Sequence, residues 1–284
     1  MSENQVITPE QLEEYMQGLY AKSKVAQKKF EREFTTNRRV DEVLRAIGMK
    51  TCEYAEELCT DALNETKMGN VNDKMSKLKG IVLGQWAICK GQNTVDYEDS
   101  PLEPGIKILY KPMGVIGCVM PSTNPVATII GNAMMALKGR NSVIIAPHPM
   151  SVRLSVKMVK LLREALESVG APADLIQCIS EEYASREATN LMMSTCDACI
   201  STGGAGRVKA AYSSGKPAFG VGQGNVQEIV DLGISDAELE RQATLCVAHR
   251  AKDNGVPCAG AQTVHIHAQQ LEQWKGYMQE HGAF

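Results

Sequence analysis

The chain has 284 residues, of which 44% are hydrophobic and 22% charged, with a formal net charge of −3 at pH 7. These values are ordinary for a soluble globular protein of one large domain or two medium ones. The charge excludes general affinity for nucleic acid or an anionic membrane, and no apolar run approaches the roughly 20 residues of a membrane span. Nine irregularly spaced cysteines and a polar N-terminus predict a cytoplasmic chain with reduced thiols.

The first third of the chain is predicted to be helical. Thr8-Pro9-Glu10-Gln11 combines a threonine cap, a proline at the first helical position and a glutamine that closes a capping box. One apolar stripe follows, formed by Leu12, Tyr15, Met16, Leu19 and Tyr20. Helical patterns continue over roughly 37–48, 51–67 and 71–91.

After a breaker-rich link at 96–105 and a strand-like run at 106–110, the pattern becomes a series of strands alternating with helices. Strands are predicted at 115–120, 142–146, 175–179, 198–201 and 217–221. Helices are predicted at 126–138, 151–168, 182–193 and 204–213. This alternation predicts an α/β fold with a Rossmann-like parallel sheet. A second capping box at Ser235 opens a helix to about 249, and a strand at 262–267 and a helix at about 269–281 follow.

Cys258 lies in a polar turn, 252–262, immediately before the alternating strand pattern of 263–267. A thiol on such a turn is exposed and held at fixed geometry, which suits a nucleophile. With nine cysteines in the chain, this signal alone is weak, and an exposed thiol without a role is the plain alternative.

Two other groupings predict structural or surface residues. Cys196 and Cys199 have the spacing of a redox or zinc pair, but no second pair accompanies them, so structural thiols are expected. His265 and His267 share a strand face without further ligands at suitable spacing, so surface histidines are expected and no metal site is predicted.

Five motifs in order carry a family resemblance, namely Pro-Ser-Thr-Asn-Pro (121–125), Ala-Pro-His-Pro (146–149), Ser-Thr-Gly-Gly (201–204), Gly-Val-Gly-Gln-Gly-Asn (220–225) and Asp-Asn-Gly-x-x-Cys (253–258). This order resembles the aldehyde dehydrogenase superfamily, and within it the CoA-acylating branch. The resemblance runs from about residue 10 to the last residue. It departs from the family at Gln223 and Ala261, where proline or a small residue and glutamate are usual.

The resemblance implies roles for individual residues. Cys258 would be the nucleophile, and the Asn124 amide would stabilise the oxyanion together with the backbone N–H of Cys258. The dinucleotide would contact Pro121, Ser122, Thr123, Pro147, His148, Thr202, Gly203 and Gly204. Gly204–Lys209 is the nearest match to the dinucleotide fingerprint but lacks its last glycine. NAD and NADP both stay open.

Val221-Gly222-Gln223-Gly224 stands where hydrolytic relatives carry Glu-Leu-Gly-Gly, whose glutamate activates water. A valine cannot act as a base, so the resemblance implies transfer of the acyl group to coenzyme A rather than hydrolysis. The expected reaction converts a short aldehyde, succinate semialdehyde or acetaldehyde, to acyl-CoA with reduction of NAD(P), or the reverse. A hydrolytic or esterase-type thiol enzyme is the alternative that Val221 argues against.

The resemblance also implies three parts. Residues 1–112 would form an N-terminal helical region with an oligomerisation-hairpin arm, 113–224 the dinucleotide-binding domain and 225–284 the beginning of an α/β catalytic domain. A chain shortened after the catalytic cysteine is expected, so a catalytically incomplete nucleotide- or CoA-binding fragment, or a partner of a C-terminal complementing chain, is a further alternative. The family implies a homo-oligomer. In microcompartment relatives an N-terminal amphipathic helix can be a packaging tag; packing on its own domain is favoured here.

Overall fold

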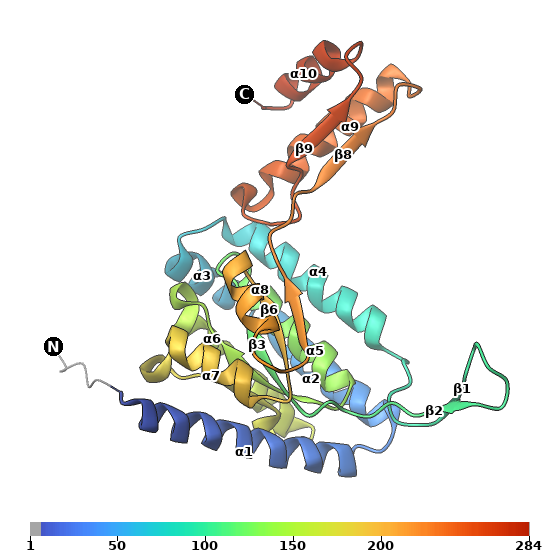
Figure 1. Ribbon diagram of the computed structural model, residues 1–284. Helices are drawn as coiled ribbons and strands as arrows, with labels where there is room; N and C mark the ends of the chain where they lie inside the picture. Colours follow the sequence, from blue (N-terminus) through green and yellow to red (C-terminus); the bar gives the residue numbers. More distant parts are fainter. Residues whose placement is uncertain (1–6, 284) are drawn as a thin grey trace.

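The computed structural model describes residues 7–283, which form a body, a thin projecting hairpin and a C-terminal lobe (Figure 1). The helices are α1 (Pro9–Glu33), α2 (Asn37–Glu53), α3 (Ala55–Thr66), α4 (Val71–Cys89), α5 (Pro125–Lys138), α6 (Val152–Ser168), α7 (Arg186–Thr195), α8 (Ala205–Tyr212), α9 (Asp236–Ala251) and α10 (Leu271–Glu280). The strands are β1 (Glu98–Asp99), β2 (Lys107–Ile108), β3 (Val115–Val119), β4 (Ser142–Ala146), β5 (Ile176–Cys178), β6 (Ala198–Thr202), β7 (Ala218–Val221), β8 (Gln227–Val230) and β9 (Thr263–Ile266).

The body is built on a five-stranded sheet in the order β5-β4-β3-β6-β7, with every neighbouring pair parallel. The predicted α/β class with a Rossmann-like sheet is therefore confirmed. All five residues of β3 and of β4 are buried, which is why these strands appear in the sequence as continuous apolar runs.

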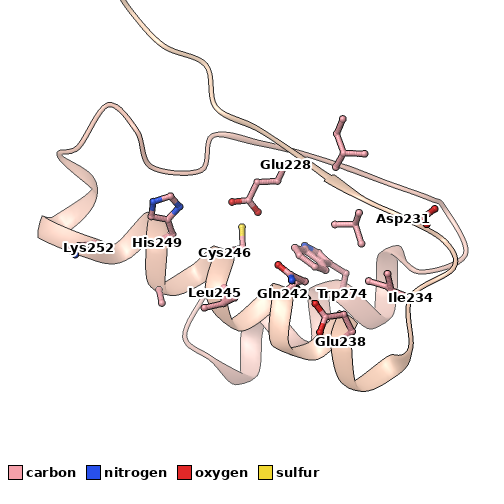
Figure 2. Close-up of a pocket in the computed structure, with 13 residues that line it drawn as sticks. Glu228, Asp231, Ile234, Glu238, Gln242, Leu245, Cys246, His249, Lys252 and Trp274 are labelled. Atoms are coloured by element: carbon pink, nitrogen blue, oxygen red, sulfur yellow. Dashed lines mark hydrogen bonds between the residues drawn. The ribbon is translucent and has the colours of Figure 1, made fainter. Parts of the chain in front are cut away.

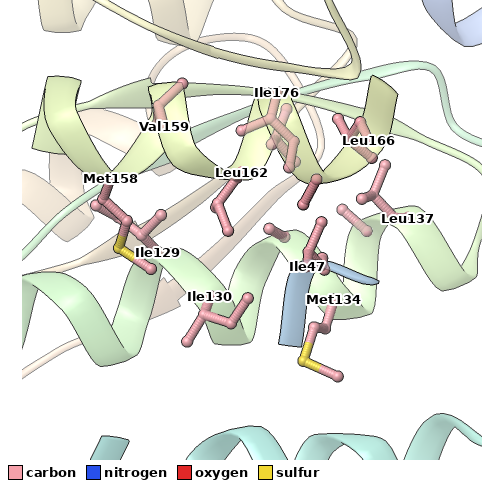
Figure 3. Close-up of a cluster of buried hydrophobic side chains, with 14 of the residues drawn as sticks. Ile47, Ile129, Ile130, Met134, Leu137, Met158, Val159, Leu162, Leu166 and Ile176 are labelled. Carbon is pink, nitrogen blue, oxygen red and sulfur yellow. The ribbon is translucent and has the colours of Figure 1, made fainter. Parts of the chain in front are cut away.

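Successive side chains of β3 enter different cores, because a strand alternates its faces. Ile116 and Cys118 pack with α2, α4, α5 and α6, whereas Val115 and Val119 pack with α1 and α7. Figure 3 shows the first core, where Ile47 of α2 meets side chains of α5 and α6. Helices from the first third of the chain thus share one core with the sheet. The predicted division at residue 112 stays a prediction.

Helix α1 packs along the body, as favoured from its apolar stripe. The Thr8 capping box is present, with both reciprocal hydrogen bonds formed. Met16 is fully buried, the Tyr15 ring stacks on the Tyr183 ring at 3.8 Å, and the Tyr20 hydroxyl donates to Asp197 at 3.0 Å.

Some boundaries differ from the predicted ones for local reasons. The helix expected at 182–193 begins at Arg186, because the Ser185 hydroxyl caps it by accepting from the N–H of Ala188 at 3.0 Å. The break expected near residue 50 lies at Tyr54, between α2 and α3. Strand β1, which was not predicted, pairs antiparallel with β2 at the base of the projecting hairpin.

The C-terminal lobe is a small α/β unit, in which parallel strands β8 and β9 pack with α9 and α10. Its core contains Leu239, Ala243 and Trp274 and is separate from the two cores of the body. The Ser235 hydroxyl caps α9 as predicted, but the Glu238 carboxylate binds Arg241 and Gln242 instead of closing the box. Among the described helices, none is long and apolar enough to cross a membrane.

Candidate functional site

Three predicted nucleotide-binding segments meet at one edge of the sheet. The register pairs Val119 of β3 with Ala146 of β4 and with Ser201 of β6, so the three strands end together. The segments 121–123, 147–148 and 202–204 lie at or directly after these ends. Between β3 and β6 the order of the strands reverses. Ligands of doubly wound sheets bind at such a reversal, outside the carboxyl ends of the strands.

His148 and Arg207 lie close together at this edge. The N–H of Met150 donates to His148 Nδ1 at 3.2 Å, which leaves Nε2 to carry the proton of the neutral ring. Partial burial, followed by the nearby Arg207 charge, lowers the pKa of His148. Arg207 was not predicted as a site residue, although it lies inside the imperfect glycine motif that pointed to this turn.

The turn at the start of α8 suits a phosphate group. A Cβ placed on Gly204 would meet nothing within 4 Å, whereas one on Gly203 would lie 3.2 Å from Cδ of Arg207. The first N–H groups of a helix lack partners within the helix. Within residues 7–283 the Arg207 guanidinium makes no salt bridge or hydrogen bond. An open glycine turn, free N–H groups and an unpaired cation fit a dinucleotide diphosphate.

Asn124 begins α5 without capping it through its side chain. Its Oδ1 is buried and has no hydrogen-bond partner among the described residues, and Nδ2 makes only a 3.4 Å contact with Thr123 Oγ1. Thr123 and Asn124 line a small cavity with Lys74 and Lys77 of α4. The long contact to Thr123 is therefore the one hydrogen bond that the Asn124 side-chain amide makes among the described residues.

Cys258 is the one exposed cysteine of the nine. Its turn runs beside residues 222–226: a Cβ on Gly224 would lie 3.4 Å from the Cys258 carbonyl oxygen, and the N–H groups of Gln262 and Thr263 donate to Val226 at 3.1 Å. The segment that lacks the hydrolytic glutamate thus lies against the turn of the predicted nucleophile.

The other cysteines are buried or half-buried. Burial raises the pKa of Cys59 to about 11 and that of Cys118 to about 12. Cys196 and Cys199 are both buried, which confirms them as structural thiols. His265 and His267 are exposed, as predicted, and His265 Nε2 lies 2.6 Å from the Gln227 side-chain oxygen.

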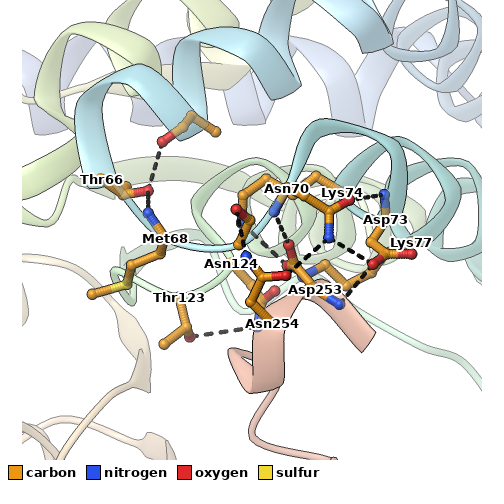
Figure 4. Close-up of polar contacts among 12 residues, drawn as sticks. Thr66, Met68, Asn70, Asp73, Lys74, Lys77, Thr123, Asn124, Asp253 and Asn254 are labelled. Atoms are coloured by element: carbon orange, nitrogen blue, oxygen red, sulfur yellow. Dashed lines mark hydrogen bonds and ion pairs between the residues drawn. The ribbon is translucent and has the colours of Figure 1, made fainter. Parts of the chain in front are cut away.

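A buried charge cluster joins the Cys258 turn to the body (Figure 4). The Asp253 carboxylate is fully buried, and its Oδ2 lies 2.7 Å from Lys77 Nζ and 3.1 Å from Lys74 Nζ. Its Oδ1 accepts from the N–H of Asn70 at 2.8 Å, and its own N–H donates to Asp73 at 2.8 Å. The sequence contained Lys74 and Lys77 on one helix face, but nothing in it indicated which acid they meet.

A further concave surface lies elsewhere, in the C-terminal lobe. It has a volume of about 790 Å³, lies along β8 and α9, and is lined by Glu228, Cys246, His249 and Trp274 among others (Figure 2). Burial and then a hydrogen bond to Glu228 raise the pKa of Cys246 to about 12, so this thiol is no nucleophile at neutral pH. None of the predicted site residues lines this surface.

Comparison with known proteins gives one consistent family. The model of the aldehyde dehydrogenase family matches residues 13–281. A succinate-semialdehyde dehydrogenase (acetylating) from Clostridium kluyveri is 40% identical over 266 residues, which make up 94% of this chain and 57% of that protein.

Solved structures agree. An acetylating aldehyde dehydrogenase from Geobacillus thermoglucosidasius matches with a TM-score of 0.89 and 32% identity, covering 96% of this chain and 60% of that one. A propionaldehyde dehydrogenase from Rhodopseudomonas palustris, solved with CoA and an acylated cysteine, matches with a TM-score of 0.82 and 27% identity over 95% of this chain and 60% of that one.

The chain spans somewhat more than half the length of these proteins. The family model covers both the body and the C-terminal lobe, including the three strand ends and the Cys258 turn. The order of motifs in the sequence, the parallel sheet and these matches lead to the same family. The chain belongs to the aldehyde dehydrogenase family.

Proposed function

We propose that the chain carries the dinucleotide-binding body and the nucleophile of a CoA-acylating aldehyde dehydrogenase. The observation that carries this proposal is the contact of the Cys258 turn with the segment around Gly224. In that segment, residues 221–225, the sequence places no carboxylate that could activate water. The acetylating relative and the CoA-bound neighbour support the same reaction class.

In this reaction the Cys258 thiolate attacks the aldehyde carbon, which forms a C–S bond and puts negative charge on the aldehyde oxygen. The Asn124 amide and the N–H of Cys258 donate hydrogen bonds to that oxygen. A nicotinamide cofactor, when bound, accepts the hydride that this carbon loses, and a thioester on Cys258 remains. Attack by the CoA thiolate breaks the C–S bond and returns the Cys258 thiolate.

The cofactor would lie along the carboxyl edge of the sheet. Its diphosphate would meet Thr202, Gly203, Gly204 and the Arg207 guanidinium, while Pro121, Ser122 and Thr123 would line the side towards Cys258 and Pro147 and His148 the other flank. Arg207 offers a cation to either NAD or NADP. Succinate semialdehyde is the proposed aldehyde, supported by the name of the 40% identical relative, with acetaldehyde as the alternative.

A dinucleotide-binding module without turnover is the second candidate. The nucleotide-side residues all lie in the body, whereas Cys258 lies in a lobe with a core of its own. The chain can therefore bind the dinucleotide through its body even if it does not turn over an aldehyde.

The test measures NADH absorbance with purified protein, NAD or NADP, CoA and short aldehydes including succinate semialdehyde. The proposal predicts CoA-dependent formation of NAD(P)H that disappears in Cys258→Ser. Product formed without CoA, as the free acid, would contradict it. Calorimetric binding of NAD with no turnover at any aldehyde would favour the binding module.

A further inference from the structure

The C-terminal lobe makes few polar contacts with the body. Of the side-chain hydrogen bonds and ion pairs among residues 7–283, those joining 226–283 to 7–223 all involve Asp253 or Asn254. The lobe also has a separate apolar core. Apart from the connecting chain at 222–226, the side-chain hydrogen bonds and ion pairs between lobe and body are those that Asp253 and Asn254 make with residues 69–77, at and just before the start of α4.

The backbone at these contacts is strained. Asp253, Asn254 and Gly255 are consecutive residues with φ of 50°, 56° and 72°. Left-handed geometry is unfavourable for a residue that carries a Cβ, so surrounding contacts must over-determine it. Here the Asp253 carboxylate accepts from Lys74, Lys77 and the N–H of Asn70, and its own N–H is also bonded.

The same lysines also lie beside the predicted oxyanion donor. Lys74 and Lys77 line a cavity together with Thr123 and Asn124. The Asp253 carboxylate lies against both lysines (Figure 4). Asp253 and Cys258 both belong to the turn formed by residues 252–262. One carboxylate therefore connects the region of the oxyanion donor to the turn of the nucleophile.

We propose that Asp253 is a positioning residue, which with Lys74 and Lys77 fixes the Cys258 turn against the body beside Asn124. The proposal rests on the proposed function of Cys258 as nucleophile. Asp253 touches neither substrate nor cofactor in this account. It acts through the turn, and misplacement of a reacting atom by about 1 Å can cost on the order of 100-fold in rate.

The first test substitutes Gly69, which has φ of 75° and stands against the cluster. A Cβ there would collide with the Asp253 carboxylate and lie 2.8 Å from Lys74 Nζ. Gly170→Ala is the matched control, because Gly170 has φ of 73° but a Cβ there meets nothing within 4 Å. Both variants carry the same backbone strain, and only Gly69→Ala disturbs the cluster.

We expect Gly69→Ala to speed hydrogen exchange of the peptide 252–262 roughly tenfold or more, with exchange of β3 and β4 unchanged. In the active enzyme it should lower kcat by roughly 10- to 100-fold and leave the Kd for NAD within about twofold. Gly170→Ala should change neither. Equal exchange in 252–262 for both variants, or an unchanged kcat in Gly69→Ala, would overturn the proposal.

A second pair of variants tests the proposal independently, in case Gly69→Ala does not fold. Lys77→Met keeps the stem and removes the cation that lies 2.7 Å from Asp253, whereas Lys77→Arg keeps the charge. Faster hydrogen exchange of the peptide 252–262 in Lys77→Met, with the original rate retained in Lys77→Arg, supports the positioning role of Asp253. Equal exchange rates in the two variants contradict it. If the unsubstituted chain binds NAD but shows no turnover, the proposed activity of this chain fails. The hydrogen-exchange data alone then decide whether Asp253 positions the Cys258 turn.

Discussion

Gly224 lies against Cys258, so close that a Cβ on the glycine would come within 3.4 Å of the Cys258 carbonyl oxygen. The contact places the segment after β7 beside the turn of the proposed nucleophile. Residues 221–225 are therefore where a base could reach a Cys258 thioester, and here they are apolar, glycine or amide residues.

The first prediction concerns Val221, the last residue of β7, which is 52% exposed and can be replaced by a longer side chain without burial of a charge. Val221→Glu is expected to add thioester hydrolysis, since a positioned general base contributes typically 10²- to 10⁴-fold. The measurement is NADH formation from aldehyde without CoA. Val221→Gln is the uncharged control, and equal CoA-independent rates in both variants would contradict the proposed acyl-transfer route.

The second prediction concerns Asn124, whose side-chain amide makes only one long hydrogen bond, to Thr123, among the described residues. Asn124→Ala should lower kcat by about 10²- to 10³-fold, as for removal of one oxyanion donor. Calorimetry should find NAD binding unchanged, because the residue acts on the aldehyde oxygen. Asn64→Ala, at an exposed position of α3, is the control. A rise in KM with kcat unchanged would instead assign Asn124 to ground-state binding.

The third prediction concerns thiol reactivity. Because one cysteine is exposed and burial raises the pKa of the others that shift, a thiol-specific chromogenic reagent should react rapidly with one thiol per native chain. Cys258→Ser should abolish that fast phase, and all remaining thiols should react in denaturant. Rapid reaction of two or more thiols in the native protein would contradict this prediction.

The fourth prediction concerns Gly114, which precedes β3 with φ of 125°. A Cβ there would collide with the Asp197 carboxylate and lie 2.9 Å from Lys24 Nζ, so Gly114→Ala should destabilise the fold by about 1–3 kcal/mol. Gly80→Ala in α4 meets nothing within 4 Å and should stabilise by about 0.5–1 kcal/mol. Urea unfolding measures the difference in stability between the two variants. Equal urea midpoints would refute the predicted collision of a Cβ at Gly114 with Asp197.

The fifth prediction concerns acid stability. Burial by itself raises the pKa of Asp197, but the hydrogen bonds from Lys24, the Val115 N–H and Tyr20 together lower it by more, so the net shift of the pKa is downward. The pKa of Asp253 is lowered in the same way, by Lys77, Asn70 and Lys74 against the effect of burial. A depressed folded pKa contributes stability that is fully present above the unfolded pKa of about 3.9 and is lost as pH falls through the folded value.

The urea midpoint should therefore hold from neutral pH to about 5 and decline below about 4. Lys24→Met removes the first favourable partner of Asp197, so its midpoint should start lower at neutral pH and decline less steeply in acid. Parallel curves for the two proteins, or a midpoint that rises in acid, would show that Asp197 does not contribute in this way.

Much of this protein was determined by local sequence. The buried runs of β3 and β4, the caps at Thr8 and Ser235, and the alternation of strands and helices were predictable, because period, capping and apolar continuity act over a few residues. The exposure of Cys258 and the burial of Cys196 and Cys199 followed from turn and strand chemistry in the same way. The motif order also indicated the family, since each motif is contiguous.

The tertiary structure alone decided how distant segments meet. Lys74 and Lys77 precede Asp253 by more than 170 residues, and Arg207 approaches His148 only because β4 and β6 flank β3 in the sheet. No local pattern records such pairings, since an ion pair between separate elements depends on sheet order and on how the lobe docks. The sequence therefore determined which groups are available for chemistry, and the packing of α4 against the Cys258 turn decided how they are held together.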